Sequence, residues 1–171
     1  MVGIKILICI AIVCITSYMG IELASSLNKR EKILIDMVTF LKLVQNEMKY
    51  MLNGIPNAFE KSRQNLSSSL KYSIGAIVVD MEKYGVKNVD NSIDININSI
   101  TELSSYDKQL VISTLKNLGR SDIESQNNII TNAIEILQRQ IKEARDKKEK
   151  NTKVYRTVGI ISGLLIIVIF I

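Results

Sequence analysis

Apolar residues recur at intervals of three or four along residues 28–52, a spacing that places them on one face of a helix. The members of this face are Ile33, Met37, Phe40, Val44, Met48 and Met51. The sequence Asn53-Gly54-Ile55-Pro56 predicts where the helix stops, because glycine favours helix C-termini and proline favours the first turn of the next helix. We therefore predict one helix over this stretch, continuous with the apolar run that precedes it.

The next stretch repeats the helical spacing and closes at Gly85. Serines at 67–69 and a glycine at 75 both weaken helix interiors, so the sequence allows an interruption at either place and leaves the choice open. The apolar face of this stretch comprises Phe59, Leu66, Leu70, Ile74, Ile77, Met81 and Tyr84.

Residues 86–104 carry a mixed pattern. Ile93, Ile95 and Ile97 alternate with polar residues, which taken alone indicates an edge strand. A single strand would have no partner in this chain. We therefore predict a short helix from about Ser92 to Leu103.

Two further helices complete the pattern. Residues 105–118 carry apolar side chains at helical spacing and end at Gly119. Ser121-Asp-Ile-Glu124 has the form of a capping box, which predicts the start of a long helix. Apolar residues in that helix follow the spacing of a seam against an antiparallel or coiled-coil partner: Ile130, Ile134, Leu137, Ile141 and Ala144.

Both ends of the chain are strongly apolar. Residues 6–24 contain one charge, Glu22, and as a helix they would extend roughly 28 Å, about the hydrocarbon thickness of a bilayer. A cleaved signal peptide is the alternative, but no small-x-small pair follows the apolar core. Residues 158–171 carry no charge. We predict transmembrane helices at 4–26 and 155–171 around a helical domain at 27–153, hence an all-α, membrane-anchored bundle of about five to six helices.

The net charge of +5 lies beside the second predicted span. Residues 139–156 hold eight basic and three acidic side chains, and the remaining 14 basic and 14 acidic residues cancel. By the positive-inside rule the domain is cytoplasmic and both termini lie outside. Anionic lipid headgroups explain this segment more simply than nucleic acid, because no aromatic residue before Tyr155 is available to stack on a base. We expect membrane lipids, and no nucleic acid, as partners.

The composition argues against an enzyme. Without histidine the chain cannot build a Ser-His-Asp or Cys-His nucleophile or a His-ligated metal site. Cys9 and Cys14 lie in an apolar run, where they are expected to act as small hydrophobic residues. Asp90 and Asp94 lack the alternation of a calcium loop. We expect no catalytic, cofactor-binding or metal-binding residue, and exposed surfaces that bind other proteins.

The element L-G-x-S-D-x-x-x-Q occurs at Leu118-Gly-Arg-Ser-Asp-Ile-Glu-Ser-Gln126, with Lys29-Arg30 after the first apolar run and Arg156-Thr-Val-Gly159 at the second. With these features the chain resembles the stage III sporulation protein AB family end to end. The resemblance implies an adaptor or platform subunit of a sporulation channel complex that links mother cell and forespore, placed in the mother-cell membrane around the forespore. A stand-alone two-span signalling or stress adaptor is the alternative.

The family's domain is similar to platform proteins of type II secretion and type IV pilus machines. The resemblance therefore implies two kinds of partner, other membrane proteins of the sporulation complex and a secretion-type ATPase that the platform would couple to membrane-embedded rings.

The resemblance also marks candidate site residues. Gly119 suits a helix C-terminal cap. Ser121 and Asp122 suit acceptors for the free N–H groups of the next helix, and Gln126 can bridge back to the preceding helix. Direct contact with a partner is the alternative for this corner, and Arg30 is predicted to be a topology anchor. The full candidate set is Leu118, Gly119, Ser121, Asp122, Gln126 and Arg30.

Overall fold

The computed structural model describes residues 15, 28–48, 54–64 and 66–170, without the side chains of 68, 151–153, 155–156 and 158–170. The chain divides into two compact units, and the helical domain is the unit Arg30–Lys142. Throughout the described ranges the regular structure is helical and no strand occurs, which confirms the all-α prediction. The elements are the helix 28–48, α2 (Gly54–Ser62), α3 (Ser68–Tyr84), the short 3₁₀ helix η1 (Val86–Asn88), α4 (Asp90–Asn98), α5 (Ser105–Asn117) and α6 (Ile123–Phe170).

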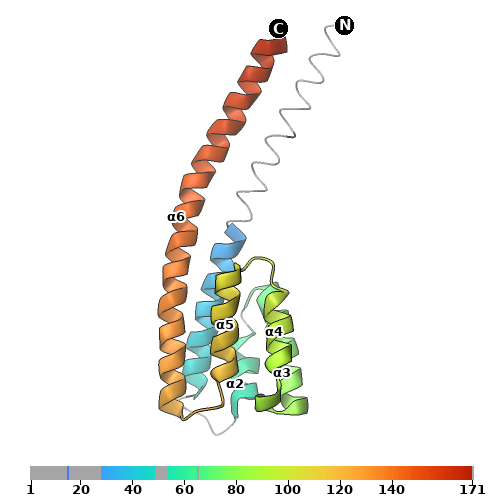
Figure 1. Cartoon of the computed structure of the whole chain (residues 1–171), viewed down its shortest axis with the longest axis vertical. Helices are drawn as coiled ribbons and strands as arrows, with labels where there is room; N and C mark the ends of the chain where they lie inside the picture. Colours follow the sequence, from blue (N-terminus) through green and yellow to red (C-terminus); the bar gives the residue numbers. More distant parts are fainter. Residues whose placement is uncertain (1–14, 16–27, 49–53, 65, 171) are drawn as a thin grey trace. The chain divides into compact units, whose positions relative to one another are not determined.

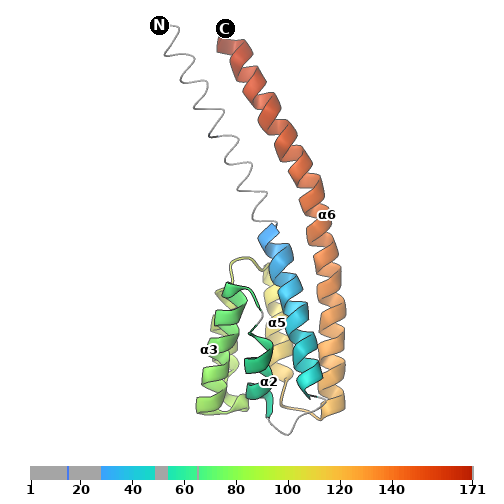
Figure 2. The same cartoon turned by 180° about the vertical axis from the view of Figure 1, so that it is seen from behind.

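Successive helices of the domain run in alternating directions (Figures 1 and 2). The helix 28–48, α3 and α5 begin at one end, which we call the Arg30 end. The helices α2, α4 and α6 begin at the other, which we call the Gly119 end. Helices that follow one another from α2 to α5 also pack against one another.

The apolar face predicted for the first helix forms the centre of the core. Its members at 33, 37, 40, 44 and 48 are all buried, and Met51 lies outside the described residues. The Phe40 ring meets the Phe59 ring of α2 edge to face, with ring centroids 5.1 Å apart. The part of the predicted stop at 53–56 that concerns the next helix is confirmed, since α2 begins at Gly54 and Pro56 lies in its first turn.

The structure resolves the open choice in the second helical stretch. The interruption lies before α3, whose N-cap is Ser67, and α3 runs unbroken through Gly75. Gly85 ends α3 as predicted, with φ +82°, a conformation that favours glycine.

Residues 90–98 form α4 and not a strand, which confirms the predicted helix, although it begins and ends earlier than expected. In a helix, Ile93 and Ile97 are one turn apart and both are buried, whereas Ile95 points away and is 60% exposed. The alternating isoleucines therefore divide between core and surface.

Four of the five residues of the seam predicted for α6 lie inside the domain, and the fifth, Ala144, falls in the other unit. Ile130, Ile134 and Leu137 are buried, and Ile141 is half-buried. At the Gly119 end of this seam Gln45 Nε2 donates hydrogen bonds to Asn127 Oδ1 at 2.8 Å and to Thr131 Oγ1 at 2.9 Å. A polar bridge therefore ties the helix 28–48 to α6.

The two predicted membrane spans are not confirmed. The span at 4–26 lies outside the described residues except for Ile15, and at 155–171 the structure describes a helical backbone through Phe170. Among the residues that the structure describes, no helix has an apolar stretch long enough to cross a bilayer.

Candidate functional site

The candidate residues 118–126 form the corner between α5 and α6. Leu118 ends α5 and is buried, and the backbone reverses at Gly119 with φ +80°. A Cβ on Gly119 would lie 2.8 Å from Val86 Cγ1 and 2.9 Å from Ile55 Cδ1. Both the left-handed conformation and the lack of space therefore favour glycine here.

Asp122 caps the N-terminus of α6. Its Oδ1 accepts the Ser125 N–H at 2.9 Å, and its Oδ2 accepts the Ser125 hydroxyl at 2.7 Å. These two bonds, the backbone one first, hold the pKa of the Asp122 carboxyl below its ordinary value. The predicted capping box from Ser121 to Glu124 is wrong by one residue, because the helix begins at Ile123 and so makes Asp122 the cap.

Gln126 closes the corner from inside α6. Its side chain is buried, its Oε1 accepts the Gly119 N–H at 2.9 Å, and its Nε2 donates to the Ser121 carbonyl. A buried amide that satisfies both its donor and its acceptor locks the loop geometry. The structure thus places Gln126 in contact with the residues that follow α5.

Arg120, the first of the motif's variable positions, connects the corner to the neighbouring elements. Its guanidinium donates to the Lys87 carbonyl in η1 and forms an ion pair with Asp90 at the start of α4. Sequence reasoning missed this residue, because its partners lie 30 and 33 positions away and no local pattern marks them.

Arg30 lies at the opposite end of the domain from this corner and forms a buried clamp. Its Nε and Nη2 donate to the two carboxylate oxygens of Asp107, at 2.9 and 3.2 Å, and Nη2 also donates to Gln140 Oε1 at 3.1 Å. The Asp107 side chain is fully buried, and that of Arg30 is 18% exposed. Three helices, 28–48, α5 and α6, therefore meet at one guanidinium.

Asp107 also belongs to the capping box that begins α5. Its Oδ2 accepts the Ser104 N–H at 3.1 Å and the Ser104 hydroxyl at 2.6 Å, while Ser104 Oγ accepts the Asp107 N–H. The helix start predicted at residue 105 is confirmed, and the spacing of Ser104 and Asp107 was a signal for the box that the sequence analysis did not use. Asp107 and Gln140 are functional candidates that sequence reasoning missed.

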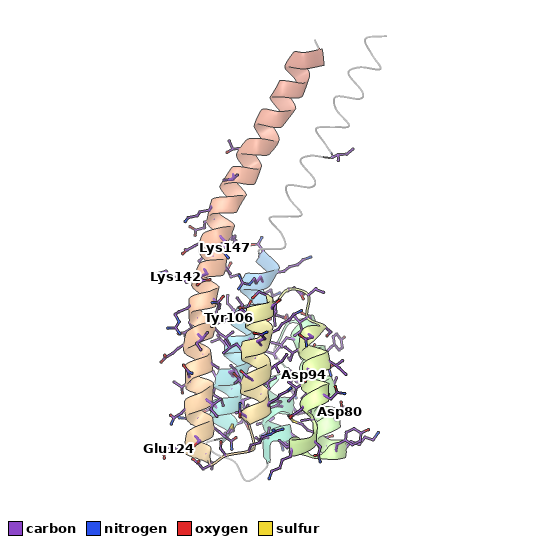
Figure 3. All side chains as sticks on the ribbon, in the orientation of Figure 1. Asp80, Asp94, Tyr106, Glu124, Lys142 and Lys147 are labelled. Atoms are coloured by element: carbon purple, nitrogen blue, oxygen red, sulfur yellow. The ribbon has the colours of Figure 1, made fainter. Side chains whose placement is uncertain are left out.

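A cavity of about 320 Å³ opens beside the corner at the Gly119 end, where Figure 3 labels Glu124. Its lining mixes apolar side chains with amides, and the Gln45 amide is already bonded to α6. Within the described ranges no three acidic or thiol side chains gather as a metal site. The lining residues are Gln45, Met48, Ile123, Glu124, Asn127 and Ile130.

What the corner and the clamp do is hold helices in position. In both, the charged and amide groups bond to backbone or to each other across elements, and Asp107 has bonds at both oxygens. Fold and site together define the class: an all-α domain built as an antiparallel helical bundle and braced at its two ends.

The family model of stage III sporulation protein AB matches residues 5–171. The chain belongs to this family, and its role is associated with sporulation. This confirms the resemblance drawn from the corner motif and the order of segments. Comparison with curated proteins and comparison with solved structures both find no significant match.

Proposed function

We propose that the protein is a membrane-anchored platform or adaptor subunit of the sporulation channel complex linking mother cell and forespore. The observation that carries the proposal is the braced bundle in a chain of this family: the Arg30 clamp and the Gln45 bridge tie the helix 28–48 to α6 at both ends. Two helices that are held in register are suited to a subunit that transmits position or force between its partners. Such a role requires no chemical step.

The proposal includes a location and partners. The chain is anchored by spans at 4–26 and 155–171 in the mother-cell membrane around the forespore, with the domain in the cytoplasm. It is not an enzyme and takes no cofactor. Its partners are other membrane proteins of the complex and a secretion-type ATPase, which it couples to membrane-embedded rings. The basic segment at 139–156 and the family's architecture support this arrangement.

Deleting the gene in a spore-forming host tests the role. Development should stop after engulfment, and the wild-type gene should restore heat-resistant spores. Normal spores from the deletion strain, or constant expression in vegetative cells, would instead favour the stand-alone adaptor.

Charge reversal on α6 tests the contact surface. Arg139 and Lys142 are exposed and lie off the buried seam. The double variant Arg139→Glu, Lys142→Glu should fail to restore spores and should lose co-purifying membrane partners, while its circular dichroism stays unchanged. A matched control, Lys42→Glu with Lys83→Glu, makes the same charge change at exposed positions on other helices and should restore spores. Equal behaviour of the two double variants would exclude this face as the contact.

Protease protection tests the topology. Lys87 is exposed in η1 at the Gly119 end. A tag inserted there should resist external protease in intact protoplasts, whereas a C-terminal tag should be cleaved. The reverse pattern would put the domain outside the cell and remove its access to a cytoplasmic ATPase.

A further inference from the structure

The Asp107 carboxylate has two structural roles that depend on each other. Its Oδ2 accepts a hydrogen bond from Arg30 Nε at 2.9 Å, which joins the helix 28–48 to α5. The same oxygen accepts the backbone N–H and the hydroxyl of Ser104, at 3.1 and 2.6 Å, in the capping box that begins α5. One buried oxygen therefore links the clamp between helices to the first turn of α5.

The clamp lies where the chain enters and leaves the domain. Arg30 is the first residue of the domain. Gln140, whose Oε1 accepts from Arg30 Nη2 at 3.1 Å, lies two residues before the last, Lys142. Because the chain is continuous through both positions, a displacement of either flanking segment acts first on the residues at this boundary.

The first turn of α5 buries little besides Asp107. Ser105 and Tyr106 are exposed in this turn, and Figure 3 labels Tyr106. Lys108 Nζ donates to the Asn98 carbonyl at 2.8 Å, but this hydrogen bond lies at the surface, where water competes with it. Helix ends that bury few side chains unfold locally at low cost. Asp107 is therefore the buried group that holds this turn in place.

The burial of Asp107 makes its charge partner essential. The Asp107 side chain is fully buried, whereas that of Arg30 is 18% exposed. Withdrawal of the guanidinium would leave a carboxylate charge inside the protein, which costs far more than the loss of an exposed ion pair. Unfolding the first turn of α5 would bring that carboxylate to water, with the loss of its bonds to Ser104.

We propose that the clamp is a release switch, which couples the flanking segments of the domain to the first turn of α5. In the closed arrangement Arg30 is bonded to Asp107 and Gln140, and the turn is folded. In the open arrangement a displaced flanking segment has withdrawn Arg30, and the turn is unfolded with Asp107 in water. This inference rests on the proposed role of the domain in transmitting position, and it names the element that responds.

Amide hydrogen exchange of the full chain in detergent micelles, resolved to single residues, tests the coupling. The Asp107 N–H is bonded to Ser104 Oγ and the Lys108 N–H to the Ser104 carbonyl, so both report on the turn. In Arg30→Met their exchange should rise about tenfold or more, because a buried charge has lost its partner. Gln140→Leu removes the bond to α6 and should raise the same two rates by a smaller factor.

The matched control is Lys116→Met, which removes the cation of another ion pair made by α5. Its partner Asp94 has a side chain 42% exposed, so water can replace the lysine and the turn should exchange as in the wild type. The Gly119 and Ser125 N–H groups, bonded at the opposite end of the domain, should keep their rates in every variant.

Adding Asp107→Asn to Arg30→Met separates the charge from the contact. Asparagine keeps an acceptor for Ser104 and has no charge to bring to water, so exchange at Lys108 should return toward the wild-type rate.

Unchanged exchange at Asp107 and Lys108 in Arg30→Met would overturn the switch, as would a double variant that exchanges as fast as Arg30→Met. An equal rise at Gly119 and Ser125 would also overturn it, because the domain would then open as a whole. Normal spores from the deletion strain would instead overturn the proposed function and leave the measured coupling intact.

Discussion

Removing the fully buried Asp107 carboxylate should destabilise the domain far more than removing a half-buried carboxylate from an ion pair of similar length. The Asp107→Ala change leaves the Arg30 guanidinium, 18% exposed, without its charge partner, and it also removes the capping box with Ser104. Breaking a buried pair in this way costs about 3–5 kcal/mol, a large share of the about 5–15 kcal/mol that stabilises a small domain. The pair of Lys116 and Asp94 is 2.7 Å long but more open to solvent, with side chains 28% and 42% exposed, so Asp94→Ala should cost only about 0.2–1 kcal/mol.

Urea unfolding of the 27–153 segment, followed by circular dichroism, measures both costs. A double variant that replaces Arg30 by methionine and Asp107 by alanine separates the charge from the cap. Because no unpaired charge remains, the double variant should be more stable than Asp107→Ala alone. If Asp107→Ala and Asp94→Ala cost the same, or if the double variant is the least stable of all, the clamp does not stabilise the domain as argued.

Three further changes test other parts of the fold. Gly119→Ala should cost about 1–3 kcal/mol in backbone strain, with more from contact with Val86 and Ile55. Adding Val86→Ala should recover the part of the contact cost that is due to Val86 and none of the strain, as urea unfolding would show. Leu137→Asp removes a fully buried leucine, worth about 2–5 kcal/mol, and buries a carboxylate, so the 27–153 segment should unfold or aggregate; an unchanged thermal melt would place the seam against solvent. The pKa of Asp122 lies below its ordinary value of 3.8, so its stabilising effect is complete above that pH and is lost as the pH falls through the lowered pKa. Ser125→Ala should raise the pKa measured by NMR titration only in part, because the backbone bond remains, and no rise would contradict the assigned hydroxyl bond.

Local patterns in the sequence were sufficient to predict most helices and their stops. Gly85 and Gly119 end helices because both adopt positive φ, which a pattern of apolar runs followed by glycine indicates well. The corner motif could likewise be interpreted from its residue types, since caps and bridges act over a few positions. The cap moved from Ser121 to Asp122 because either side chain can accept the free N–H groups, and only the helix start decides between them.

Contacts between distant residues could not be predicted in the same way. Arg30 and Asp107 are 77 positions apart, and nothing near either of them indicates the other. Arg30 follows an apolar run, so its charge suggested a membrane boundary; its bonds to Asp107 and Gln140 depend on how three helices assemble. The predicted role of Arg30 as a topology anchor and its observed role in the clamp are compatible, because one guanidinium can serve in both.

The two polar bridges between the helix 28–48 and α6 limit the insertions and deletions that the fold can tolerate. The bridges join Arg30 to Gln140 and Gln45 to Asn127, so the segments between them must stay matched. One residue inserted between positions 127 and 140 would advance the rest of α6 by about 1.5 Å and rotate it by about 100°. Only one of the two bridges could then form, and the apolar seam would turn outward. Single-residue insertions and deletions should therefore be rejected in this part of α6, whereas point substitutions at its exposed positions should be accepted.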